Sequence, residues 1–350
     1  MVGIAESRRA RCGLFALAVS LGSLGNSCSA AVPHTVATPA SHPIPPDLHG
    51  EPLAFLPSSP LVWVRVDMRA VRVSQHWEAG FPLLAQNAGE GLATIERELG
   101  FDPIRVADMV ALGLYAAPGA RPGDGSHAWP VFYARGAIQR EAILVAARAR
   151  ARPDDPLIEH TVDGVRFLAT RERGYLFPAN DVVFVFDAAL TRRVLHQIDG
   201  TERSSVGNES RFDALWTQID GRNGAIEVAG DAASLRAIGA PVDEVASAAG
   251  EGDLGTSRIE QAVMAADLDA AVHIRVAALA SDNDAAQRIV SNIDAIRSAL
   301  LHRWDVRLLG MTRLLMQGLT DVHEERIVRI HLDAEPAEVV RLLRVARLAQ

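Results

Sequence analysis

Short runs of hydrophobic residues recur along the chain from about residue 53, and polar stretches separate them. In the first part of the chain, Val-rich or alternating runs of this length predict strands, and they fall at 61–68, 106–116, 129–136, 157–170 and 174–187. The last two runs are long enough to be hairpins, and Asp163-Gly164 in the first of them suits the positive dihedral angles of a tight turn. Apolar positions at helical spacing predict helices, which fall at 74–100, 137–151 and 188–198.

The second part of the chain mixes the same two periodicities. Strands are predicted at 224–230, at 322–334 and as a pair within 257–279. Helices are predicted at 211–219, 285–319 and 336–348, with a loose Ala-rich helical region up to 249. Strand pairs followed by helices occur twice, which predicts an α+β fold with antiparallel-rich sheets and helices on one face. The element order allows a second interpretation, in which the chain consists of two similar halves, 51–204 and 205–350, that meet at a polar stretch near residue 205.

The longest predicted helix carries a continuous apolar stripe. Its members recur at spacings of three and four, and they are Ile289, Ile293, Ile296, Leu300, Trp304, Leu308, Met311, Leu315 and Leu319. A stripe of this kind is typical of a helix that packs on a sheet. The alternative is a groove or lid for an apolar ligand, which would make the protein a carrier.

Residues 1–27 have the features of a secretory signal peptide. Arg8, Arg9 and Arg11 precede an apolar run from Cys12 to Leu24, and small residues follow. The run is shorter than the roughly 20 residues that a membrane-spanning helix needs. We therefore expect an exported protein of the periplasm or outer envelope.

Cys28 stands where a bacterial lipoprotein signal is cut. Cleavage before Cys28 would expose it for acylation, whereas cleavage after Ala30 or Ala31 would follow the small-x-small rule of ordinary signals. Residues 28–50 are rich in proline, which predicts an extended tether. The other cysteine of the chain, Cys12, lies inside the signal, so no disulfide is expected after cleavage.

Composition narrows the range of partners. The 350 residues are 49% hydrophobic, which is enough for a sizeable core, and the net charge is −8. All 35 basic residues are arginine, and no basic patch with interleaved aromatic residues occurs, so nucleic acid is not an expected partner. We expect contact with a membrane through the lipid anchor, and an envelope protein or an apolar ligand as further candidates.

Three stretches resemble a known group of sequences. "LPSSPLVWVRVDMRAVRVSQHW", "LGFDPIRVADMVALGLY" and "HTVDGVRFLA" are similar to the DUF3352-like exported bacterial proteins of unknown function. In that group a strand ending in Val-Asp precedes a helix, and a Gly-Phe-Asp-Pro element introduces a strand pair. The resemblance implies the compartment and the fold, and it implies no activity.

No catalytic motif is recognisable, so the sequence assigns no catalytic, cofactor-binding or metal-binding residue. On the predicted strand 322–334, His323, Glu325, Arg329 and His331 share one face by the two-residue period. His323 and Glu325 have the chemistry to hold a divalent metal, although a solvated strand face is the expected interpretation. Cys28, as the lipid attachment site, is the one site residue predicted.

The expected function is that of a binding or structural module of the envelope rather than an enzyme. Two alternatives stay open: a hydrolase or metal-dependent enzyme whose site is assembled from scattered residues, and the carrier of an apolar ligand.

Overall fold

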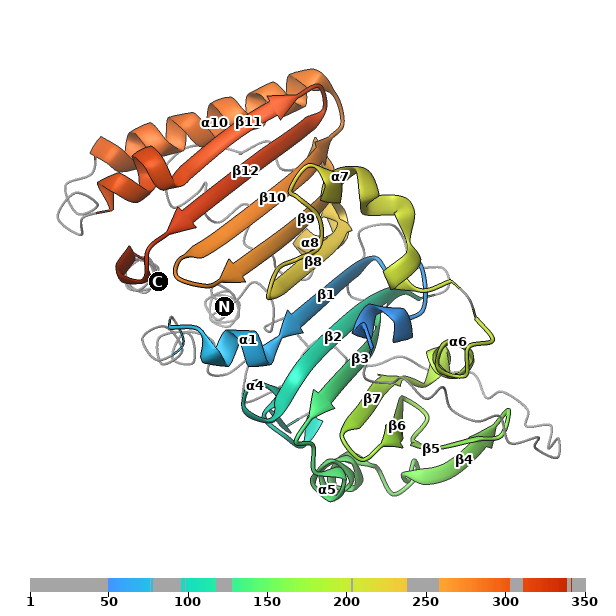
Figure 1. Ribbon diagram of the computed structural model, residues 1–350. Coiled ribbons are helices and arrows are strands. Elements are labelled where there is room, and N and C mark those ends of the chain that lie inside the picture. The colour runs from blue at the N-terminus through green and yellow to red at the C-terminus, as the bar shows by residue number, and fades with distance from the viewer. Residues whose placement is uncertain are drawn as a thin grey trace, which may run out of the picture.

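The computed structural model describes residues 50–75, 77, 96–97, 99–117, 128–202, 204–237, 258–302, 311–338 and 341. Within these residues twelve strands form one antiparallel sheet (Figure 1). The strands are β1 (Val62–Asp67), β2 (Ala107–Ala116), β3 (Ala128–Gly136), β4 (Ile158–Val162), β5 (Val165–Ala169), β6 (Arg173–Ala179), β7 (Val182–Asp187), β8 (Ile226–Asp231), β9 (Ile259–Leu268), β10 (Val272–Ala280), β11 (Leu319–Glu324) and β12 (Ile327–Ala334).

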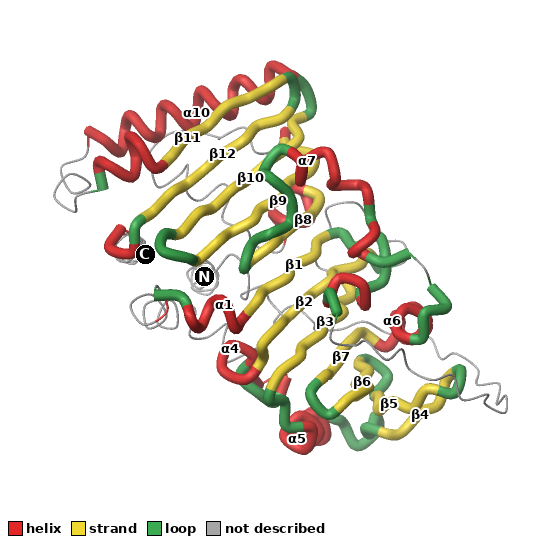
Figure 2. The backbone as a smooth tube through the Cα atoms, viewed as in Figure 1, coloured by secondary structure: helices red, strands yellow, loops and turns green. Residues whose placement is uncertain are grey.

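Helices of very different lengths surround the sheet (Figure 2). The α-helices are α1 (Met68–Val73), α4 (Pro103–Val106), α5 (Arg140–Arg150), α6 (Thr191–Ile198), α7 (Asp213–Thr217), α8 (Ala232–Ala237) and α10 (Asn283–His302). The short 3-10 helices are η2 (Pro52–Phe55), η4 (Ala188–Leu190), η5 (Val206–Asn208) and η6 (Ser210–Phe212), and η8 (Leu314–Gly318) is a π-helix. The mixture of antiparallel strands and helices confirms the predicted α+β class.

Strands β1 and β8 lie side by side in the middle of the sheet. The sheet continues from β1 through β2, β3, β7, β6 and β5 to β4, and from β8 through β9, β10 and β12 to β11. Strands from both parts of the sequence therefore share one continuous sheet, whereas the sequence pattern had predicted separate sheets. Among the described strands, β4 and β11 form the two edges of the sheet.

The two faces of the sheet carry separate buried clusters. Trp63 packs in a cluster that includes Leu195 of α6, and Val64 packs in a cluster that includes Ile143 of α5. Because consecutive residues of a strand point to opposite faces, we call these the Trp63 face and the Val64 face. Helices cover both faces, so the expectation of helices on one face only does not hold here. Runs such as Val182–Phe186, apolar at every position, are typical of strands buried on both sides.

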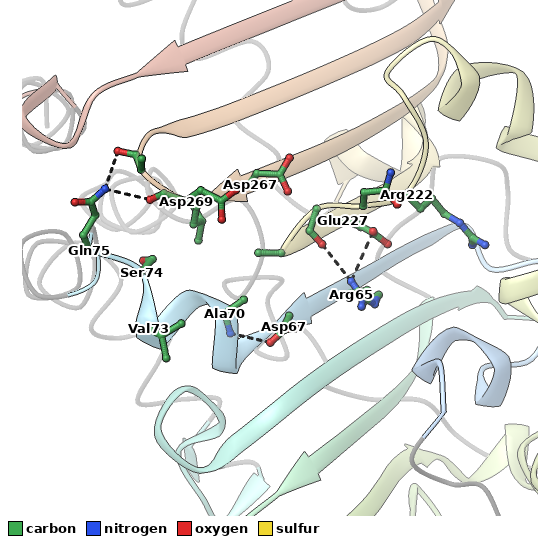
Figure 3. A pocket seen from close by; sticks show the side chains of 15 residues that line it. Arg65, Asp67, Ala70, Val73, Ser74, Gln75, Arg222, Glu227, Asp267 and Asp269 are labelled. Carbon is green, nitrogen blue, oxygen red and sulfur yellow. Dashed lines mark hydrogen bonds and ion pairs between the residues drawn. The ribbon is translucent and has the colours of Figure 1, made fainter.

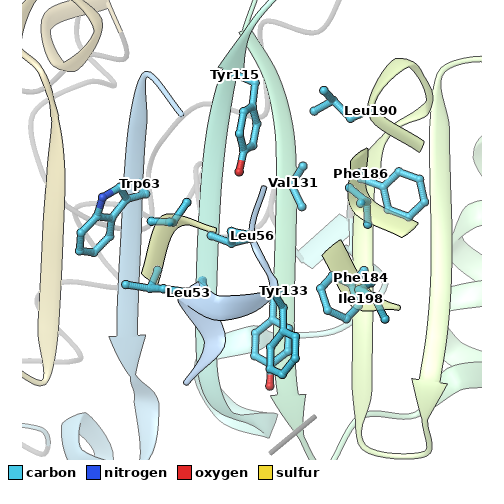
Figure 4. Close-up of a cluster of buried hydrophobic side chains, with 14 of the residues drawn as sticks. Leu53, Leu56, Trp63, Tyr115, Val131, Tyr133, Phe184, Phe186, Leu190 and Ile198 are labelled. Atoms are coloured by element: carbon cyan, nitrogen blue, oxygen red, sulfur yellow. The ribbon is translucent and has the colours of Figure 1, made fainter. Parts of the chain in front are cut away.

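The largest cluster lies on the Trp63 face (Figure 4). Its strands contribute Trp63 and Phe184, and the start of the globular part contributes Leu53 of η2 and Leu56, which directly follows η2. The ring of Trp63 stacks on Trp216 from the region of α7, with centroids 5.6 Å apart. The residues that directly follow the predicted tether are thus part of the core.

The long predicted helix ends earlier than its pattern indicates. α10 is described as far as His302, residues 303–310 lie outside the described part, and β11 has already begun at Leu319. Ile289 of the apolar stripe packs on Ala280 and Val328 of the sheet. In the described residues the stripe is therefore core rather than an open groove, while Trp304 and Leu308 are not described.

The predicted strand 322–334 is a hairpin instead. β11 and β12 pair through Glu324 and Ile327, and the turn holds Glu325 at a φ of +51°. The turn was missed because Glu-Arg lacks the Gly, Asn or Asp residues that usually mark such turns. In contrast, the predicted turn at Asp163-Gly164 is confirmed, with φ values of +51° and +82° between β4 and β5.

A short helix that the pattern did not predict, α1, begins at Met68 and precedes the helix predicted from Ser74. Asp67 ends β1, and its carboxylate accepts a hydrogen bond from the Ala70 N–H at 2.8 Å, which caps α1. Ser74 is the residue at the C-terminal end of α1. Most of the predicted span 74–100 lies outside the described residues, although Gly100 has the positive φ of +78° expected at a helix end.

Candidate functional site

A cleft of about 820 Å³ opens where β8 begins (Figure 3). One wall is the end of β1 with α1, the other is the turn between β9 and β10, and the loop that precedes β8 forms the floor. Six of its fifteen lining residues are charged: Arg65, Asp67, Arg222, Glu227, Asp267 and Asp269. Four carboxylates therefore face two guanidinium groups in this cleft.

Arg65 and Glu227 form the buried centre of the cleft. They stand directly opposite each other in the β1–β8 register, with Nη1 of Arg65 3.6 Å from Oε1 of Glu227. Nη1 of Arg65 also donates to the carbonyl of Gly224 at 3.2 Å, and its Nε lies 3.1 Å from a carboxylate oxygen of Glu51. Glu227 is only 2% exposed. Burial raises the pKa of the Glu227 carboxyl, and the Arg65 guanidinium opposes that shift.

The floor of the cleft requires glycine at position 224. A Cβ there would lie 2.8 Å from the carbonyl oxygen of Ile226 and 2.9 Å from the backbone nitrogen of Ala266. Only a residue without a side chain lets the loop lie this close to β9. That close approach places the Gly224 carbonyl within reach of Arg65.

Hydrogen bonds connect the two walls of the cleft. Nε2 of Gln75, just after α1, donates to the carbonyl of Ala270 at 2.8 Å and to that of Asp269 at 3.3 Å. Asp267 accepts from Nη2 of Arg275 at 2.6 Å. The cleft is therefore held open between elements that are fixed relative to one another, which is typical of a largely preformed binding site.

The described lining is made of carboxylates, guanidinium groups, side-chain amides, small or aliphatic side chains and backbone. Its fifteen residues include no histidine or cysteine, and the hydroxyl of Ser74 donates to the carbonyl of Val71 at 2.8 Å. Among the described residues, no three His, Cys, Asp or Glu side chains gather as metal ligands. The cleft presents carboxylates, guanidinium groups and backbone carbonyls to a polar ligand.

The sequence-predicted site residues lie elsewhere. Cys28 falls outside the described residues, together with the signal and the tether. His323 is on β11 and Glu325 is in the turn, whereas Arg329 and His331 are on β12, so the four side chains do not share one strand. No helix within the described ranges has the length and apolar character to cross a membrane.

The residues of the cleft were not singled out from the sequence, although a signal was there. Arg65 interrupts the apolar run of β1, and Glu227 interrupts that of β8. A charge in the middle of a buried strand needs a partner. The partner could not be named, because the two residues are 162 positions apart and only the β1–β8 pairing brings them together.

Comparison with known proteins assigns no family. No protein-family model matches the chain, and no curated protein matches it. Crystal form I of TP0453 is similar with a TM-score of 0.42 and 10% identity, covering 85% of this chain and 97% of that chain. Crystal form III has a TM-score of 0.44 and 9% identity, covering 85% of this chain and 98% of that chain. Similarity at this level assigns neither family nor function.

Proposed function

We propose that this protein is an exported, lipid-anchored module of the bacterial envelope that binds a polar ligand in the cleft between β1, α1 and the β9–β10 turn. The observation that carries the binding part is the cleft itself. Its volume of about 820 Å³ falls in the range of small-molecule sites, and converging charged groups line it.

The anchor part of the proposal rests on the N-terminal sequence. Acylation of Cys28 after cleavage of residues 1–27 would attach the protein to a membrane, and residues 28–50 would act as the tether. Leu53 and Leu56 are both buried in the core. Their burial is consistent with a tether that ends at residue 50. Kinship with the DUF3352-like exported proteins is part of the same proposal and would place it in the periplasm or outer envelope.

The anchor is tested by metabolic palmitate labelling and intact mass. We compare the wild type with Cys28→Ala and use Cys12→Ala as the matched control, because Cys12 lies within the signal. The expected result is lipid on the wild type and on Cys12→Ala but not on Cys28→Ala. A wild-type N-terminus at residue 31 or 32 without lipid would show ordinary cleavage and refute the anchor.

The cleft is tested by native mass spectrometry of protein purified from its own envelope. Ala270 is an exposed residue of the cleft wall, so Ala270→Trp should fill the mouth without disturbing the core. Val145→Trp, on the exposed side of α5, is the control. We expect a retained small-molecule mass on the wild type and the control that is absent from Ala270→Trp. The same mass on all three proteins would place the ligand outside the cleft.

We also propose that the chain consists of two similar halves, residues 51–204 and 205–350. The matching order of the five innermost strands on each side supports them, whereas β5 and β4 extend the sheet on one side only.

A further inference from the structure

The strands follow the same order outward from the β1–β8 pair as far as β6 on one side and β11 on the other. Val64 of β1 and Val228 of β8 face each other directly. Each next strand outward continues this row on both sides, so that residues at equal distance from the central pair form equivalent pairs. These pairs are Leu112 and Met264, Phe132 and Val276, Val185 and Ile330, and Tyr175 and Asp321. Ten strands therefore carry one unbroken row of paired residues, which runs outward from Val64 and Val228 through five strands on each side.

The elements next to the central strands repeat in the same order. Asp67 stands three residues after Val64, ends β1 and begins α1. Asp231 stands three residues after Val228, ends β8 and begins α8. Helices α5 and α10 follow the equivalent strands β3 and β10. The repetition therefore extends from strand register to chain connectivity.

One arginine of each half donates a hydrogen bond across the boundary between the halves. Arg65 of the first half donates to the carbonyl of Gly224, four residues before Val228. Arg211 of the second half donates to the carbonyl of Pro60, four residues before Val64, at 2.5 Å. Each guanidinium is also paired with carboxylates: Arg65 with Glu51 and Glu227, and Arg211 with Glu209 and Asp231.

Between these two arginines, Trp63 stacks on Trp216 of the other half. A buried aromatic pair flanked by ionic contacts has the composition of the core of a subunit interface. We infer that the β1–β8 seam is such an interface fused within one chain, and that the matching half of a second copy of this chain fits the same surface.

The segment that links the two halves makes no contact that would be lost if two chains exchanged their halves. Thr201, Glu202 and Ser204 are exposed, and they connect α6 to the start of the second half. Halves exchanged between two chains would keep the strand pairing, both arginine contacts and the tryptophan stack. The link acts by holding the partner half at an effective concentration on the order of millimolar, as short tethers do.

The test uses the folded full-length protein with a protease site inserted after Glu202. Isotopically heavy and light samples are cleaved, checked for a folded circular dichroism spectrum, mixed and followed by native mass spectrometry. We expect 1:1 complexes that come to contain one heavy and one light half. Arg65→Ala with Arg211→Ala should speed the exchange, on the order of tenfold or more for each buried charged hydrogen bond lost.

Arg105→Ala with Arg166→Ala is the matched control, because both side chains are largely exposed and lie away from the seam. It should exchange at the wild-type rate. Unfolding on cleavage would show that the halves are not self-contained and would overturn the inference. So would a folded, cleaved protein whose halves never mix even when both seam arginines are removed. Exchange of the halves depends neither on acylation of Cys28 nor on a ligand in the cleft. A negative result in either of those tests therefore does not change the outcome of the exchange experiment.

Discussion

Replacing Arg65 with methionine tests the energetics of the cleft most directly. The substitution keeps a long apolar stem, but it leaves the Glu227 carboxylate, 2% exposed, without the guanidinium opposite it. Removing one partner of a buried ion pair costs about 3–5 kcal/mol, since the remaining charge stays desolvated. Arg65 itself is 16% exposed, so we expect the lower end of this range, on the order of 3 kcal/mol.

The cost should depend on pH in a definite direction. Burial raises the pKa of Glu227 on folding, and Arg65 opposes the rise. A group with a raised pKa binds more protons in the folded chain than in the unfolded one, so stability falls as pH rises through that pKa. Without Arg65 the effect of burial on the pKa of Glu227 is opposed less strongly, so the loss of stability with rising pH becomes larger. The difference between wild type and Arg65→Met should therefore be small near pH 5 and larger at pH 8.

The assay is urea denaturation at several pH values, with the free energy of unfolding extrapolated to water. Arg105→Met is the control, because Arg105 is 75% exposed in its pair with Asp102 and should change stability by less than about 0.5 kcal/mol. Adding Glu227→Gln to Arg65→Met should recover most of the loss at pH 8. An Arg65→Met penalty that is the same at every pH would refute the assignment of the loss to an unpaired Glu227 carboxylate.

Three further outcomes are expected from the same structure. Gly224→Ala places a Cβ 2.9 Å from the backbone of β9 and should cost about 1–3 kcal/mol, whereas Gly207→Ala, with its nearest atom at 3.4 Å, should cost clearly less in the same urea titration. Trp63→Ala removes a core ring that is 1% exposed and should lower stability by about 3–5 kcal/mol; Val73→Ala, at 77% exposure, should leave the melting temperature nearly unchanged. Burial also raises the pKa of Asp231, so Asp231→Asn should reduce the loss of stability as pH rises from 4 to 7, and an unchanged slope would contradict that burial effect.

Much of the fold could be predicted from local patterns. The hairpin at Asp163-Gly164 and the cap at Asp187, whose carboxylate accepts from the Ala189 N–H at 2.9 Å, depend on residues close in sequence. Their physical causes are a residue pair tolerant of positive φ and a side chain that satisfies a free helix N–H. Such local sequence signals can be recognised without any knowledge of tertiary contacts.

What escaped prediction depends on contacts between distant residues. The pairing of β1 with β8 joins the two parts of the chain into one sheet, and nothing near Val64 indicates Val228 as its partner. The cleft exists only because of that pairing, so the link between Arg65 and Glu227 was equally hidden. The β11–β12 turn at Glu325 escaped for a different reason, since its residues have no preference for positive φ.

An open sheet of this width has consequences for aggregation, because each edge presents unpaired backbone groups to other chains. At the β11 edge, Asp321 points inward to an ion pair with Arg297 of α10, and His323 and Glu324 are exposed. At the β4 edge, Glu159 is exposed near its partner Arg166 of β5, and the strand is only five residues long. Inward charges, exposed polar side chains and a short end strand oppose edge-to-edge growth, whereas Val322 of β11 and Ile158 of β4 are exposed apolar side chains that favour it. The charged side chains at these edges therefore limit the pairing of a wide, open sheet with neighbouring molecules.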